Sequence, residues 1–105
     1  MKLNINGFEW TLLFVPDNDK RLGTVEEGYM NLGNTEFDKL MIAINSDVDE
    51  QVQRSTIIHE LAHAYIASIG IDDDVFSEEG MCKFIGCNLL TIYGLYEQVM
   101  EKKEV

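Results

Sequence analysis

The sequence is poor in the residues that build disulfide frameworks and small zinc sites. It holds two cysteines, Cys82 and Cys87, which lie in one predicted helix at a spacing unsuited to mutual bridging. No C-x-x-C pair occurs, which excludes a structural zinc site of that kind. There is also no run of ~20 apolar residues for a membrane span and no export signal. These absences predict a cytoplasmic protein with no membrane partner.

Positive charge is scarce as well. Eight Lys and Arg stand against nineteen Asp and Glu, which gives a formal net charge of −11 at pH 7. Such a charge repels nucleic-acid phosphates and anionic lipids, so nucleic acid is not expected as a partner. The role of this negative charge is either to keep the protein soluble or to attract a basic partner.

What the sequence does contain predicts one small α+β domain over residues 1–105. The hydrophobic fraction is 46%, enough for a single core. Alternating apolar residues around the turn signal Asn6-Gly7 predict a β-hairpin over residues 2–15. Apolar runs and apolar periodicity predict two more strands, joined by a loop at Gly33-Asn34, and two long helices. These elements are Gly28–Leu32, Leu40–Asn45, Glu50–Ser68 and Ser77–Lys102, which gives a small antiparallel or mixed sheet packed on the two helices.

Both histidines of the chain lie in the first of these helices, in the segment His59-Glu60-Leu61-Ala62-His63. Residues four apart share a helix face, with Cβ atoms roughly 5–6 Å apart, so both imidazoles can reach one ion at ~2.0–2.1 Å. Glu60 lies about 100° further round the helix, too far to be a ligand but close enough to reach a water on the same ion. This H-E-x-x-H spacing is typical of zinc peptidases, with Glu60 as the general base. The apolar surroundings predict that all three side chains are buried.

A catalytic zinc takes three protein ligands and keeps a fourth position open for water. Because no third histidine exists, the remaining ligand must be a carboxylate or a thiolate. Glu78 and Glu79 open the second predicted helix, and a helix–loop–helix hairpin would bring them back to His59 and His63. Acids at a helix start also complement the helix dipole without any other role, but the upstream motif favours a ligand here.

The motif, together with a helix that opens with Glu79-Gly80-Met81-Cys82, resembles the ImmA/IrrE-type zinc metallopeptidases, especially small members encoded by phages and prophages. The resemblance covers about residues 41–90 and includes the strand that leads into the motif helix. It implies a zincin-like fold, one zinc ion and Glu79 as the third ligand, with Glu78 as the alternative. It also implies hydrolysis of peptide bonds in a limited set of protein substrates, such as phage or prophage regulators.

Such chemistry is usually helped by a donor that stabilises the transition state. Tyr29, Arg54 and Tyr93 are the candidates, whereas Tyr65 and Cys82 are expected to pack in the interior. The substrate backbone is expected to pair with the exposed edge of the strand Gly28–Leu32, as extended peptides do.

Two other functions explain part of the pattern. A non-catalytic module that holds zinc for regulation or interaction accounts for the histidines but leaves Glu60 without a role. An acidic inhibitor that mimics nucleic acid accounts for the charge but not for the motif. Bound zinc would exclude the inhibitor. The substitution Glu60→Gln would separate the other two functions, because only a peptidase loses turnover while it retains its metal.

Overall fold

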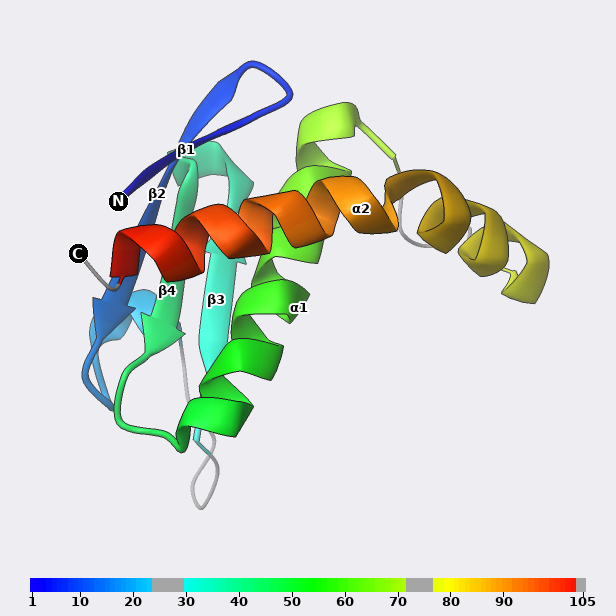
Figure 1. Cartoon of the computed structure of the whole chain (residues 1–105). Helices are drawn as coiled ribbons and strands as arrows, with labels where there is room; N and C mark the ends of the chain where they lie inside the picture. The colour runs from blue at the N-terminus through cyan, green and yellow to red at the C-terminus, as the bar shows by residue number, and fades with distance from the viewer. Residues whose placement is uncertain (24–29, 72–76, 104–105) are drawn as a thin grey trace.

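The computed structural model describes residues 1–23, 30–71 and 77–103. These residues form one mixed four-stranded sheet, two short 3₁₀ helices and two long α-helices, which confirms the α+β class (Figure 1). In chain order the elements are β1 (Lys2–Ile5), β2 (Phe8–Val15), η1 (Lys20–Leu22), β3 (Gly33–Glu36), η2 (Phe37–Lys39), β4 (Met41–Asn45), α1 (Glu50–Ile69) and α2 (Glu78–Lys103).

The sheet has the strand order β1-β2-β4-β3. β1 and β2 are the predicted antiparallel hairpin, and Asn6 and Gly7 at its turn have φ values of 50° and 88°. Two positive φ angles are what a type I′ turn requires, which explains the Asn-Gly pair. β4 lies between β2, to which it is parallel, and β3, to which it is antiparallel. β4 is therefore one of the two inner strands of the sheet.

The position predicted for the edge strand was wrong. Gly28 and Tyr29 lie outside the described residues, and residues 30–32 are not part of a strand. The edge strand is instead Gly33–Glu36, where a loop was expected. Its sequence, Gly-Asn-Thr-Glu, contains no apolar run, and each of its residues is half-buried. Its strand conformation comes from pairing with β4 and from contact with α1, and local propensity does not report such tertiary effects.

The core lies between one face of the sheet and the two helices. Its buried apolar side chains come from β1, β2, β4, α1 and the second half of α2: Leu3, Ile5, Trp10, Leu12, Ile42, Ile44, Ile57, Leu61, Ala64, Leu95 and Val99. The hairpin is fixed to the end of α1 by two hydrogen bonds to Ser68. Trp10 Nε1 donates to Ser68 Oγ at 2.9 Å, and Asn6 Nδ2 donates to the Ser68 carbonyl at 2.9 Å. These bonds set how far α1 lies along the sheet.

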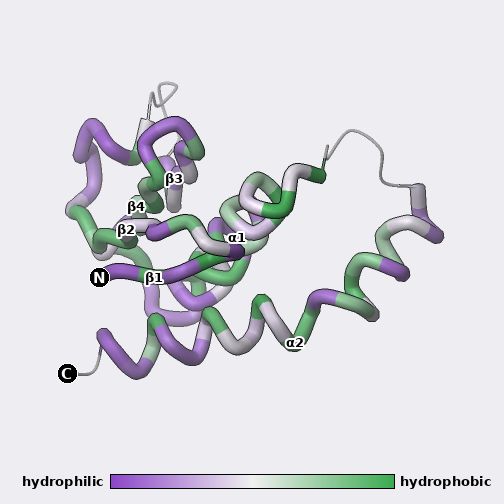
Figure 2. The backbone as a smooth tube through the Cα atoms, turned by 90° about the horizontal axis from the view of Figure 1, so that it is seen from above, coloured by the Kyte–Doolittle hydropathy of each residue, from purple (hydrophilic) through white to green (hydrophobic). Residues whose placement is uncertain are grey.

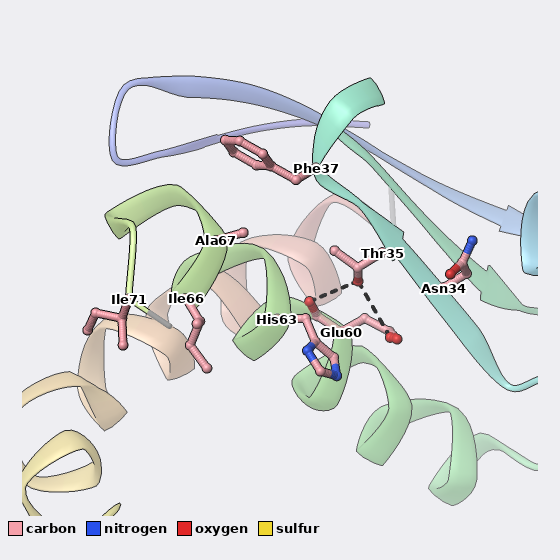
Figure 3. Close-up of a pocket in the computed structure, with 8 residues that line it drawn as sticks. All are labelled: Asn34, Thr35, Phe37, Glu60, His63, Ile66, Ala67 and Ile71. Atoms are coloured by element: carbon pink, nitrogen blue, oxygen red, sulfur yellow. Dashed lines mark hydrogen bonds between the residues drawn. The ribbon is translucent and has the colours of Figure 1, made fainter. Parts of the chain in front are cut away.

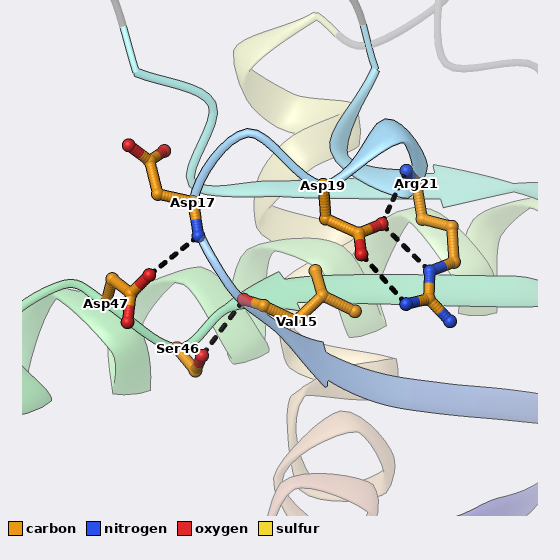
Figure 4. Close-up of polar contacts among 6 residues, drawn as sticks. All are labelled: Val15, Asp17, Asp19, Arg21, Ser46 and Asp47. Atoms are coloured by element: carbon orange, nitrogen blue, oxygen red, sulfur yellow. Dashed lines mark hydrogen bonds and ion pairs between the residues drawn. The ribbon is translucent and has the colours of Figure 1, made fainter.

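The turn that leads into α1 is fixed to the end of β2 (Figure 4). Ser46 Oγ donates to the Val15 carbonyl at 3.0 Å, and the Asp17 amide donates to Asp47 Oδ2 at 2.7 Å. Nearby, Arg21 donates two side-chain hydrogen bonds of 2.9 Å to Asp19, and these bonds hold the pKa of the Asp19 carboxyl at about 2. These bonds hold the turn before α1 at the end of β2, while the bonds to Ser68 hold the other end of the helix against the hairpin.

The two halves of α2 have different surroundings. In the second half, Ile92, Leu95 and Val99 are buried. The first half projects from the rest of the molecule, and hydrophobic residues alternate with hydrophilic ones along it (Figures 1 and 2). The two long helices meet where Tyr65 Oη donates to Asn88 Oδ1 at 2.6 Å. Neither α1 nor α2 is long and apolar enough to cross a membrane, and the same holds for every other helix of the described residues.

Candidate active site

The three motif residues lie together in the middle of α1. His59 Nε2 and His63 Nε2 are 3.1 Å apart, and the imidazole rings meet edge to face with centroids 4.8 Å apart. One potential ligand atom from each of His59, Glu60 and His63 lies within 4.8 Å of the others. Among the described residues this is the one group of three or more His, Cys, Asp or Glu side chains close enough that it could hold a metal ion. Glu60 thus lies nearer to the histidines than expected, because it was predicted to be too far away to be a ligand.

The burial of this group differs from the expectation. Glu60 is 6% exposed and lies on the side of α1 that faces the sheet, so the prediction of burial is right for Glu60. His59 and His63 are exposed, so that prediction was wrong for the histidines. The reason is that α1 buries one face only. Ile57, Leu61 and Ala64 share the inner face with Glu60, and the histidines point outward beside it.

Thr35, on the edge strand β3, is the nearest polar partner of Glu60 (Figure 3). Its Oγ1 donates to the Glu60 carbonyl at 3.2 Å and lies 3.5 Å from Glu60 Oε2. Burial raises the pKa of the Glu60 carboxyl, while His63, His59 and the Thr35 hydroxyl oppose that rise. A carboxylate with a raised pKa is a better proton acceptor, which suits a general base.

Gly33 allows β3 to lie this close to α1. A Cβ atom at Gly33 would lie 2.8 Å from Glu60 Cγ, 2.8 Å from Thr56 Cγ2 and 3.2 Å from the Ala43 carbonyl oxygen. Any larger residue would therefore push Glu60 or the strand out of place. Sequence reasoning placed Gly33 in a loop and missed Thr35. The one available signal was their spacing of two, which puts both on one face of a strand.

Two cavities lie along β3, and Glu60 lines both. The first has a volume of about 330 Å³ and contains His63, Thr35 and Asn34, together with an apolar end formed by Phe37, Ile66, Ala67 and Ile71 (Figure 3). The second has a volume of about 300 Å³ and is lined by Leu32, Gly33, Ser55, Thr56, His59 and Glu60. Glu60 therefore stands where the two cavities adjoin.

The backbone of β3 offers hydrogen-bonding groups at the sheet edge. The Asn45 amide donates to the Leu32 carbonyl at 2.9 Å, and Leu32 is followed by the pairs Gly33↔Ile44, Asn34↔Ala43 and Thr35↔Ile42. In an antiparallel ladder, hydrogen-bonded and non-bonded pairs alternate. The N–H and C=O groups of Gly33 and Thr35 therefore point away from β4, toward the edge of the sheet, where no strand of the described residues pairs with β3.

The predicted third ligands lie elsewhere in the structure. Glu78 and Glu79 are exposed in the first turn of α2 and are not part of the His59–Glu60–His63 group. That turn lies at the projecting end of α2 (Figure 1). Their role as ligands stays a prediction.

The residues predicted to stabilise the transition state or to pack in the interior lie in different parts of the molecule. Tyr29 lies outside the described residues. Arg54 and Tyr93 are exposed, and neither lines the two cavities beside Glu60. Tyr65 is half-buried and packs against the core, as predicted. Cys82 is exposed, so the expectation that it packs in the interior was wrong. The projecting first half of α2 explains this exposure.

No protein-family model matches the chain, and comparisons with curated proteins and with solved structures gave no match either. The function must therefore be argued from the site itself.

Proposed function

We propose that this chain is a zinc-dependent metallopeptidase of a zincin-like kind. The observation that carries the proposal is the arrangement on α1. His59 Nε2 and His63 Nε2 lie 3.1 Å apart on the exposed side of α1. The buried carboxylate of Glu60 lies next to them, near the edge strand β3. The resemblance of the motif to ImmA/IrrE-type peptidases points in the same direction.

The histidine geometry fits zinc. Two nitrogens that each lie 2.0–2.1 Å from a tetrahedral ion are about 3.3 Å from one another. The two Nε2 atoms are 3.1 Å apart without any change of rotamer. Both imidazoles are exposed, so an ion can reach them from solvent. We propose that His59 and His63 would hold one zinc ion and that Glu79, with Glu78 as the alternative, would complete the site.

Each side chain then has one task. When bound, zinc would lower the pKa of a water to ≈ 7 and polarise the substrate carbonyl. Glu60 takes the proton of the attacking water and passes it to the leaving amine. Thr35, whose hydroxyl lies within 3.5 Å of the carboxylate, and Gly33, which leaves room for the Glu60 Cγ, form the surroundings of this carboxylate.

The substrate path follows β3. An extended peptide can add to a free sheet edge through main-chain hydrogen bonds. The outward N–H and C=O groups of Gly33 and Thr35 provide this edge, which replaces the strand Gly28–Leu32 expected from the sequence. A peptide on this edge would run from one cavity to the other past Glu60, so its scissile bond would lie beside the general base.

The site favours few substrates over general digestion. Both cavities are small, close to the lower end of the roughly 300–1,000 Å³ typical of ligand sites. We therefore propose a limited set of protein targets. The resemblance to ImmA/IrrE-type peptidases suggests phage or prophage regulatory proteins as such targets.

The test is cleavage by the zinc-loaded protein of candidate repressors and of a peptide library derived from a denatured proteome, with new termini identified by mass spectrometry. Glu60→Gln is the control, because it preserves the shape of the side chain and removes the base. Wild-type protein should cleave at defined sites, whereas Glu60→Gln should retain zinc and lose ~10²–10⁴-fold in rate. Equal cleavage by both proteins would reject the proposal.

One observation favours a second candidate function. The group of described residues that can hold a metal consists of His59, Glu60 and His63, without an acid from α2. If Glu60 itself binds the ion, it is not free to act as a base, and the site serves regulation or interaction. Wild-type protein that retains one zinc and cleaves nothing would support this function. Protein that binds no zinc would exclude both functions.

A further inference from the structure

The first cavity beside Glu60 has two chemically different ends. Glu60, His63 and Thr35 form its polar end, at the motif. Side chains without any polar atom form the other end, and they come from three places in the chain: η2, the last turns of α1 and the residue after its C-cap (Figure 3). An apolar wall next to a reactive carboxylate is the arrangement of a specificity pocket.

The apolar end contains large side chains that remain open to solvent. Phe37 is 44% exposed and Ile71 is 41% exposed, while Ile66 and Ala67 are half-buried. Exposed apolar area that is concentrated at a cavity marks a binding surface, whereas single scattered residues do not. Phe37 and Ile71 thus present area that a ligand can cover.

The wall is also held firmly in place. The ring of Phe37 packs edge-on against Phe8 at 5.4 Å between centroids and lies 6.0 Å from the Trp10 ring. On the other side, the Ile71 amide donates to the Ile66 carbonyl at 3.2 Å, as part of the cap of α1. A pocket whose walls are already ordered loses little conformational entropy when it is filled.

The second cavity has a different character. Apart from Leu32, its lining consists of glycine, hydroxyl side chains and the motif residues His59 and Glu60. A peptide that passes Glu60 along β3 would therefore meet an apolar pocket on one side and a small polar one on the other. The substrate residues on the two sides of the scissile bond would then be selected by different properties, one by its apolar surface and the other by its small size or polarity.

We propose that the cavity formed by Phe37, Ile66, Ala67 and Ile71 is the specificity pocket of the enzyme. It takes a large apolar side chain, of the Phe, Leu or Met class, from the substrate residue on one side of the scissile bond. This inference rests on the proposed peptidase function and narrows its substrate class.

The first test reads the residues on either side of each new cleavage site in the peptide library. Large apolar residues should be enriched on one fixed side. In matched peptides, replacement of that residue by alanine should lower kcat/KM by ~10–200-fold, the range for apolar groups in a pocket. Cleavage without such a preference would overturn the pocket and leave the peptidase function intact.

The second test uses a matched pair of variants. Ile71→Arg places a cation in the pocket, and Ile58→Arg places the same cation on α1, away from the pocket. Both isoleucines are 41% exposed, and Ile58 lines neither cavity. Ile71→Arg should abolish the apolar preference and favour acidic residues at that position, whereas Ile58→Arg should leave both activity and preference unchanged. Equal effects of the two variants would overturn the pocket.

Binding without turnover provides an independent measurement. Titration with N-acetyl-phenylalanine amide should shift the methyl NMR signals of Ile66 and Ile71, and N-acetyl-alanine amide should not. If no peptide in the library is cleaved, the peptidase function fails, and this titration still decides whether the pocket exists. No shift with the phenylalanine derivative would reject it.

Discussion

The two halves of α2 have the same apolar repeat, but the second half packs into the core and the first half is largely exposed to solvent. In the second half, Leu95 is 6% exposed and packs into the core, whereas in the first half Leu89 is 53% exposed. Apolar periodicity thus reports that a segment is helical, but it does not report what the apolar face contacts. The second half is needed for the fold. The first half contributes little to the core and carries Glu78 and Glu79, so its sequence is available for function.

The largest expected effect tests this difference directly. Leu95→Ala should destabilise the protein by about 2–5 kcal/mol, because it leaves a cavity in the core. Leu89→Ala removes the same atoms from an exposed position of the same helix and should change stability by less than ~0.5 kcal/mol. Urea denaturation followed by circular dichroism measures both. Similar losses would mean that the first half of α2 is also part of the packed core.

The next prediction asks whether the projecting half serves the site. If Glu79 is the third ligand, Glu79→Gln should weaken zinc binding by more than ~100-fold, because even a residue that only supports a ligand costs 10–100-fold. Glu78→Gln is the matched control and should retain affinity. Competition with a chromogenic chelator measures both constants. The reverse ranking would assign the ligand to Glu78, and two unchanged affinities would remove α2 from the site.

A third comparison uses two glycines, Gly33 in β3 beside Glu60 and Gly86 in the projecting half of α2. Gly33→Ala should destabilise the protein by about 1–3 kcal/mol, because the added methyl group overlaps Glu60 and Thr56. It should also lower turnover by displacing the base. Gly86→Ala adds the same group where no atom of the described residues lies within 4 Å, the adjoining residues and the nearby backbone of its own helix apart, and it should stabilise the helix by up to ~1 kcal/mol. Thermal unfolding and turnover would be measured together. A fully stable and active Gly33→Ala protein would refute the close fit of β3 to α1.

The smallest effect concerns pH. Burial raises the pKa of Glu60 in the folded protein above its ordinary value, so the folded state binds the proton more tightly than the unfolded state does. The metal-free protein should therefore lose stability as the pH rises from the ordinary glutamate pKa through the raised one, and the loss should level off above it. Glu60→Gln should lack this loss. Chelator-treated samples unfolded at a series of pH values would test the difference, and parallel curves would contradict it.

The parts of the fold with strong local signals were predictable from the sequence. The Asn6-Gly7 turn fixed the hairpin, and the helix periodicity and caps located α1 with His59, Glu60 and His63 in it. These features depend on residues close together in the chain. Pattern and local geometry were therefore enough to find them.

The rest depended on contacts between distant segments. Gly33 and Thr35 belong to the site only because β3 pairs with β4 and lies against α1. The histidines are exposed because the apolar residues of α1 gather on one side of the helix. The placement of Glu78 and Glu79 depends on how the two long helices are arranged, which no local pattern determines. The predicted ligand is for this reason the part of the site that most needs a measurement.

Trp10 is the one tryptophan of the chain, fully buried, and its ring lies 6.0 Å from that of Phe37. All indole fluorescence of the protein therefore arises at one known position, behind the wall of the proposed pocket. The emission of this residue should be blue-shifted in the native protein and should move to longer wavelength on unfolding. The molecule thus carries its own optical label, which can follow folding and the filling of the pocket without any added dye.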